Sequence, residues 1–219
     1  MELLSCVEIE PRTEKTMGSV IWMHGLGASG HDFEPIVPHL HLPAVRFVFP
    51  HAPEIPVTIN GGHVMPAWYD ILTMEPSAER ENGEQIKDSQ RQIQDLIARE
   101  VERGVPEDRI VLAGFSQGAA MSLHTGIRHG SKLLGIMVLS GYIIAADTID
   151  AELSEANKST PMFFGHGRHD DVVPMARGKT AFERFEAGRD CIWKDYRMAH
   201  QVTPEEIGDI RQWLHSRFL

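Results

Sequence analysis

Residues 109–128 read RIVLAGFSQGAAMSLHTGIR and carry the clearest structural signal in the chain. The first seven residues form an apolar run, which is typical of a strand buried on both faces of a parallel sheet. The motif G-x-S-x-G, at residues 114–118, stands between this run and a helical pattern. A serine on such a sharp turn lies in strained backbone, and side chains larger than glycine beside it would clash. The stretch therefore predicts an α/β fold with Ser116 exposed at the sheet edge as a candidate nucleophile.

The rest of the chain repeats this alternation of apolar runs and helical patterns. Further strands are expected at residues 18–24, 45–49, 133–140, 160–166 and 190–196. Helical spacing of apolar side chains indicates helices at residues 84–102, 117–128, 175–187 and 204–218. No linker or repeat interrupts the pattern. The sequence predicts one domain, residues 1–219, with a mostly parallel central sheet, helices on both faces and no separate lid domain.

The last helix has the strongest start signal. Thr203 is expected to cap its N-terminus, Pro204 to occupy the first helical position and Glu206 to complete a capping box.

Composition and charge restrict the function. The 219 residues carry 21 basic and 31 acidic side chains, which gives a formal net charge of −10. A surface of that sign repels phosphate groups, so we expect no nucleic-acid partner. No apolar run approaches the ~20 residues of a membrane helix, so stable membrane insertion is not expected. The two cysteines and an N-terminus without signal-peptide character favour a cytoplasmic location.

A serine nucleophile needs a base and an acid, and in folds with this motif they follow in the order serine, Asp or Glu, histidine. The turn at residues 166–171 (HGRHDD) supplies two candidate acids, Asp170 and Asp171, between which spacing alone does not decide. Only His200 and His215 come later. His215 falls inside the last helix, where a surface position is expected. His200 lies in a loop after a strand and is the candidate base.

An oxyanion hole is the third requirement of such chemistry. Hydrolases with this motif use the N–H of the residue after the nucleophile, here Gln117, and one from the loop after an early strand. The sequence HGLG, at residues 24–27, stands in such a loop. Its glycines allow the backbone to approach a substrate closely.

These pieces resemble the bacterial carboxylesterases related to acyl-protein thioesterases and lysophospholipases, a compact branch of the α/β-hydrolases. The resemblance covers residues 18–218. It rests on the blocks HGLGASGHDF (24–33), PVTINGG (56–62), AWYDI (67–71), GFSQG (114–118), LSGY (139–142), HGRHDDVVP (166–174) and MAHQVTPEEI (198–207).

The resemblance implies roles for individual residues. Asp170, rather than Asp171, is the acid, His200 is the base, and the backbone N–H groups of Leu26 and Gln117 form the oxyanion hole. Arg197 and Gln201, on either side of the base, depart from the family pattern of glycine and of serine or glutamate, which puts the mobility of the base and the pocket rim in question.

The resemblance also implies a substrate class. The expected reaction is hydrolysis of a small ester or thioester with a short to medium acyl chain, without cofactor or metal. Lysophospholipase or acyl-protein thioesterase activity is the alternative, and a homodimer remains open. The long segment 50–83 is expected to cross the sheet near the acyl groove. Four apolar residues either line that groove or fill the core: Met65, Trp68, Tyr142 and Val173.

Three rival interpretations remain. Residues 25–30 satisfy G-x-G-x-x-G, but the next strand ends without the acidic residue that a dinucleotide site requires. His166 and His169 could belong to a metal-dependent hydrolase, although no further ligand motif accompanies them. An inactive binding module is the third, and the ordered serine, acid and histidine argue against it.

Overall fold

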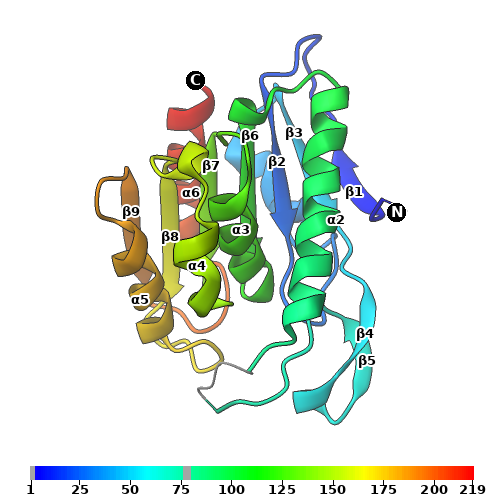
Figure 1. Ribbon diagram of the computed structural model, residues 1–219. Coiled ribbons are helices and arrows are strands. Elements are labelled where there is room, and N and C mark those ends of the chain that lie inside the picture. Colours follow the sequence, from blue (N-terminus) through cyan, green and yellow to red (C-terminus); the bar gives the residue numbers. More distant parts are fainter. Residues whose placement is uncertain (1–2, 76–79) are drawn as a thin grey trace.

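The computed structural model describes residues 3–75 and 80–219, and its centre is a seven-stranded sheet (Figure 1). Every neighbouring pair in the sheet is parallel except β1 with β3. In spatial order the strands are β1 (Cys6–Ile9), β3 (Val45–Pro50), β2 (Gly18–Met23), β6 (Ile110–Phe115), β7 (Gly135–Leu139), β8 (Met162–Gly167) and β9 (Cys191–Tyr196). The predicted mostly parallel sheet is confirmed, and each predicted strand begins and ends within two residues of its expected bounds.

Helices cover both faces of the sheet, as predicted. Side chains of β2 alternate between the two layers: Ile21 packs in a cluster with α2 and α3, whereas Trp22 packs in a cluster with α6. One layer contains α2 (Gly83–Glu102), α3 (Gln117–Arg128), α4 (Ile149–Glu152) and α5 (Met175–Phe185), and the other contains α1 (Val37–Leu40) and α6 (Pro204–Phe218). Short 3₁₀ turns lie at η1 (Glu34–Ile36), η2 (Thr58–Asn60), η3 (Glu107–Arg109), η4 (Ala146–Thr148) and η5 (Glu155–Asn157). Within the described ranges, no helix is long and apolar enough to cross a membrane.

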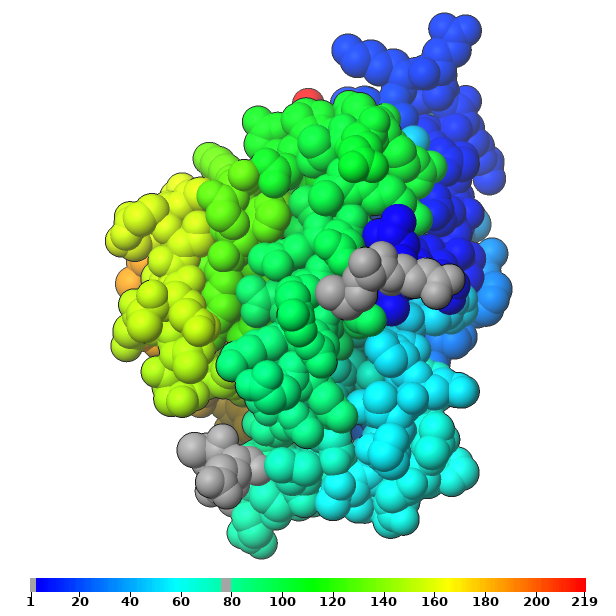
Figure 2. Space-filling model, turned by 45° about the vertical axis from the view of Figure 1, so that its right-hand side comes forward, coloured from blue at the N-terminus to red at the C-terminus, as the bar shows by residue number. Residues whose placement is uncertain are grey.

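A separate hairpin occupies part of the long segment between β3 and α2. Its strands are β4 (Glu54–Val57) and β5 (His63–Pro66), and both lie at the end of the molecule toward which β8 points (Figure 1). Gly61 and Gly62 stand between the strands with φ values of 67° and 77°, a region that glycine enters without strain. The cyan surface of this hairpin lies beside the start of α2 in Figure 2. The hairpin therefore places residues 54–66 next to the carboxyl ends of the central strands.

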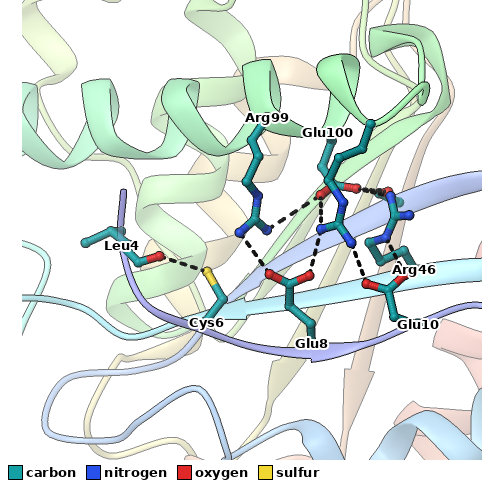
Figure 3. Close-up of polar contacts among 9 residues, drawn as sticks. Leu4, Cys6, Glu8, Glu10, Arg46, Arg99 and Glu100 are labelled. Atoms are coloured by element: carbon teal, nitrogen blue, oxygen red, sulfur yellow. Dashed lines mark hydrogen bonds and ion pairs between the residues drawn. The ribbon is translucent and has the colours of Figure 1, made fainter. Parts of the chain in front are cut away.

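Ion pairs tie the antiparallel edge strand β1 to α2 (Figure 3). Glu100 of α2 is fully buried, and its Oε2 lies 2.8 Å from the Arg46 Nη1 and accepts a 2.5 Å hydrogen bond from the Ser19 hydroxyl. Arg99 of α2 and Arg103, the residue that follows α2, extend the cluster to the edge strand. Both bind Glu8 of β1, and Arg103 also binds Glu10, just after β1. The cluster compensates the buried charge of Glu100 and holds β1 in place.

The predicted capping box at the start of α6 is wrong. Thr203 has the extended backbone of a capping residue, but its hydroxyl makes no capping bond. The side chain of Glu206 instead turns inward against Gly165 of β8, where an added Cβ would collide with Oε1. Glu206 is fully buried, and neither of its carboxyl oxygens has a hydrogen-bond partner in the described part of the chain. Burial raises the pKa of Glu206 to about 8, so the group is mainly protonated at neutral pH.

Candidate active site

Ser116 stands at the turn from β6 into α3, as the motif predicts. Its φ of 55° lies in the left-handed region, which costs about 1–3 kcal/mol for a residue other than glycine. The glycines on either side make room for this turn. A Cβ at Gly114 would collide with the backbone of Gly118, and one at Gly118 would collide with the backbone of Met23. The Ser116 N–H donates to the Leu139 carbonyl of β7 over 2.9 Å, which anchors the turn to the sheet.

Ser116, His200 and Asp170 form a continuous hydrogen-bonded chain. His200 Nε2 lies 2.9 Å from the Ser116 Oγ, and His200 Nδ1 lies 2.7 Å from the Asp170 Oδ2. Because an ionised carboxylate only accepts hydrogen bonds, Nδ1 carries the ring proton and Nε2 is left to accept from the serine hydroxyl. The arrangement is the one that general-base activation of a serine requires.

The loops after β8 and β9 place Asp170 and His200. Asp170 Oδ1 accepts the backbone N–H groups of Val172 and Val173 over 3.0 and 2.8 Å. The Asp170 side chain is fully buried, whereas Asp171 is exposed and outside this chain of hydrogen bonds. The His200 loop passes so close to Gly167 that a Cβ there would collide with the Ala199 carbonyl. The geometry therefore brings Asp170, and not Asp171, against His200, a choice that the spacing in the sequence did not make.

The residues beside His200, and the alternative histidine His215, have distinct environments. The Phe115 ring packs on the His200 ring with centroids 4.7 Å apart. Arg197 and Gln201, which depart from the family pattern, are both exposed on either side of it. His215 is half-buried rather than on the surface, and its Nε2 bonds the Leu40 carbonyl over 2.9 Å, which joins α6 to α1.

The loop after β2 presents candidate oxyanion donors. Gly27 N–H donates to the Pro66 carbonyl over 2.8 Å, and the Trp68 indole donates to the His24 carbonyl over 2.9 Å, so the hairpin segment braces this loop. Within the described residues, neither the Leu26 N–H nor the Gln117 N–H donates to an acceptor. Both N–H groups therefore remain candidates for the oxyanion hole.

His24 has a structural role that the sequence did not reveal. Its Nε2 accepts the Ala52 N–H over 3.0 Å, so Nδ1 carries the proton and donates to the Gly25 carbonyl over 2.7 Å. Burial lowers the pKa of His24, which keeps the ring neutral in this role.

Gln117 acts through its side chain as well as its backbone. Its Oε1 accepts the Trp68 N–H and its Nε2 donates to the Tyr69 carbonyl, each over 2.8 Å. The side chain is almost fully buried and joins the turn at Ser116 to residues 68–69. The only sequence signal for this contact was the position of Gln117 inside the motif.

The four residues that were expected either to line the acyl groove or to fill the core differ in exposure. Trp68, Tyr142 and Val173 are buried in the core cluster that α2 and α3 cover. The Tyr142 hydroxyl lies 2.8 Å from that of Tyr69, and burial raises the pKa of both phenols. Met65 is half-buried, and its sulfur lies 3.6 Å from the position of a Cβ on Gly27. Of the four, Met65 lies beside the candidate oxyanion loop with part of its surface exposed.

A cavity of about 850 Å³ lies elsewhere, between α2, α3 and the segment 145–152. Ser116, His200 and Asp170 do not line it.

The two histidines of the rival metal-site interpretation differ in exposure. His166 is buried and its Nε2 donates to the Val173 carbonyl, whereas His169 is exposed. In the ranges 3–75 and 80–219, no group of three or more potential ligands lies close enough together to hold a metal ion.

Comparison with known proteins agrees with the fold. The chain is 37% identical over 219 residues to acyl-protein thioesterase 1 of Gibberella zeae, a match covering 94% of this chain and 93% of the relative. It is 33% identical to acyl-protein thioesterase 1 of Saccharomyces cerevisiae, over 95% of this chain and 96% of the relative. The crystal structure of Zea mays acyl-protein thioesterase 2 superposes with a TM-score of 0.86 at 25% identity, covering 98% and 99% of the two chains.

These similarities correct one expectation. These three relatives are fungal and plant proteins, so the resemblance to a bacterial branch in particular is not supported. The phospholipase/carboxylesterase family model matches residues 4–217, which include every block named above. A match over nearly the whole chain, together with the α/β-hydrolase sheet, shows that the chain belongs to the phospholipase/carboxylesterase family of hydrolases.

Proposed function

We propose that the chain cleaves carboxylic esters or thioesters through an acyl-enzyme formed on Ser116. The observation that carries the proposal is the hydrogen-bonded chain from the Ser116 Oγ through His200 to the buried Asp170 carboxylate, with distances of 2.9 and 2.7 Å. The family relationship supports the reaction class, and the geometry supports the assignment of roles.

In the first half of the reaction, the Ser116 Oγ attacks the acyl carbon while His200 Nε2 takes its proton. The carbonyl oxygen becomes an oxyanion, which the N–H groups of Leu26 and Gln117 stabilise. The bond from the acyl carbon to the leaving oxygen or sulfur then breaks, and His200 returns the proton to the leaving group. Asp170 keeps the imidazole in the required tautomer and stabilises its cation.

In the second half, a water molecule replaces the alcohol or thiol. His200 Nε2 removes a proton from this water as its oxygen attacks the acyl carbon, and Ser116 leaves with that proton. The products are a carboxylic acid and the free enzyme. Each proton and bond is accounted for by these three side chains and water.

A thioester on a protein is the candidate physiological substrate. The relatives that are 33–37% identical over nearly the whole chain are acyl-protein thioesterases. The acyl chain would lie along Leu26 and Met65, beside the β4–β5 hairpin. A small ester is the alternative substrate, and it would use the same residues.

Replacement of the nucleophile tests the proposal. We expect Ser116→Ala to lower kcat by ~10⁴–10⁶-fold on both a nitrophenyl ester and an acyl thioester, because only the attacking oxygen is lost. The exposed Ser159 provides a matched control, and Ser159→Ala should retain wild-type rates. More than a tenth of wild-type activity in folded Ser116→Ala would rule out the mechanism.

A further inference from the structure

A second histidine faces the carboxylate of Asp170. His166, on β8, is 1% exposed, and its Nε2 lies 2.8 Å from the Val173 carbonyl and 3.5 Å from the Asp170 Oδ2. The same Oδ2 accepts the hydrogen bond from His200 Nδ1. His166 therefore approaches the oxygen through which Asp170 orients the base.

The protonation state of His166 follows from its surroundings. Its Nε2 faces two acceptors, the Val173 carbonyl and the Asp170 carboxylate, so the ring proton lies on Nε2. Burial lowers the pKa of His166, so the ring is neutral. The titratable groups that face the His166 ring are Asp170 and His200. The nearby Lys179 does not face it, because its ammonium lies over the Phe182 and Trp193 rings.

Packing fixes the orientation of the ring. The Trp193 ring of β9 stacks on it with centroids 6.2 Å apart and an interplanar angle of 18°. On the side of α5, Gly178 lies so close that a Cβ would collide with the His166 Nδ1. Neither element leaves the ring room to turn its Nε2 away from Asp170.

From this geometry we propose that His166 is a positioning residue, whose Nε2–H holds the Asp170–Val173 turn and aligns the Asp170 carboxylate on His200. The inference rests on the proposed roles of Ser116, Asp170 and His200. It assigns to His166 a part in orienting the base, in place of the metal-binding role that its motif suggested.

The contacts explain why this alignment depends on His166. Both backbone polar groups of Val173 are hydrogen-bonded: its N–H donates to the Asp170 Oδ1, and its carbonyl accepts from His166. Loss of the Nε2–H would release the Val173 carbonyl and remove the N–H dipole that lies 3.5 Å from the Asp170 Oδ2. The carboxylate would then interact more strongly with the protonated form of His200, and a higher pH would be needed to obtain the neutral base.

Two variants of His166 separate positioning from packing. His166→Phe retains a ring for the stack with Trp193 but has no N–H donor, whereas His166→Gln retains a donor near the position of Nε2. The matched control is His124→Phe, since His124 is another buried neutral histidine, on α3, whose pKa is lowered to about 3 by burial. Steady-state kinetics on a soluble nitrophenyl ester across pH 5–9, with thermal unfolding of each variant, are the measurements.

We expect His166→Phe to lower kcat by roughly 10–100-fold with KM nearly unchanged, the loss that misalignment of a reacting group produces. The midpoint of its pH–rate profile should move to higher pH, and His166→Gln should recover most of both changes. A folded His166→Phe with wild-type kcat and midpoint would overturn the proposal. So would a loss of rate with an unchanged midpoint, or one that His124→Phe reproduces. Full activity of Ser116→Ala would instead overturn the nucleophile assignment, so the two failures are distinguishable.

Discussion

Asp170 and Asp171 are neighbours in the chain but have opposite environments. Asp170 is buried and bonded to His200, whereas Asp171 is exposed. An asparagine at position 170 would favour the wrong imidazole tautomer, so we expect Asp170→Asn to lower kcat/KM by ~10⁴-fold. Asp171→Asn serves as the control and should change kcat/KM less than threefold, a rough bound for an exposed side chain. Equal losses in the two variants would reverse the assignment of the acid.

Glu206 gives a residue-scale prediction for stability. Its pKa, raised to about 8 in the folded protein, exceeds the ordinary carboxyl value, so the folded state binds more protons between these two pH values. The free energy of unfolding should therefore be highest near pH 5 and should fall as the pH rises through 8, by ~1.4 kcal/mol for each unit of pKa difference. Urea unfolding at pH 5, 7 and 9 measures this trend.

Matched variants isolate the contribution of Glu206. Glu206→Gln removes the titrating group and should flatten the dependence, whereas the same change at the exposed Glu205 should leave it intact. Parallel curves for wild type and Glu206→Gln would show that another group is responsible.

At the scale of elements, the contact between β1 and α2 depends on the buried Glu100. Three arginines converge on its carboxylate: Arg46, Arg99 and Arg103. Glu100→Ala would leave these cations without their buried partner, so we expect a loss of ~3–5 kcal/mol in the free energy of unfolding. The exposed Glu102 on the same helix is the control, and its replacement by alanine should change stability by ~0.5 kcal/mol or less.

Denaturant unfolding together with amide hydrogen exchange checks this prediction. Exchange at residues 6–9 should accelerate in Glu100→Ala, since β1 is a short edge strand held by this cluster. Unchanged protection of β1 in a variant of lowered stability would show that the cluster stabilises α2 alone.

The elements that the sequence predicted are those with a strong periodic signal. β2 and β6 are continuously apolar because helices cover both of their faces, and this pattern is visible without a structure. β1 was missed because its four residues are only half-buried and include Glu8, whose partners are distant in sequence. The hairpin β4–β5 was missed because proline and glycine obscure its alternation.

The residues of the site also divide into those that a local sequence pattern predicts and those that only the structure brings together. Ser116, His200 and the loop at residues 24–27 follow from motifs and chain order, because the carboxyl ends of parallel strands meet at one edge. The choice of Asp170 over Asp171 needed either the family resemblance or the geometry. The side-chain contacts of Gln117 and the inward turn of Glu206 join segments far apart in sequence, so no local pattern encodes them.

At the scale of the whole molecule, the surface around the site suggests how substrates of different length behave. Exposed apolar side chains occur in β5, in the segment between β5 and α2, and in the loop after Asp170: Val64, Leu72, Met74 and Val172. We expect kcat/KM to rise with acyl length, by at most ~0.8 kcal/mol of burial per methylene, and to level off once the chain extends beyond the groove. Esters and thioesters from C2 to C16 measure this. A steady increase to C16 with a jump above the micelle threshold would indicate a lipase and contradict the short groove.

The central claim is that a covalent acyl group forms on Ser116, which lies 2.9 Å from the His200 Nε2. Peptide mass spectrometry after acid quenching of the reaction with a nitrophenyl ester tests it most directly. The account predicts one added acyl group, located on Ser116 in the wild-type protein and absent from Ser116→Ala. An acyl group on another residue, or turnover without any acylated peptide, would contradict it.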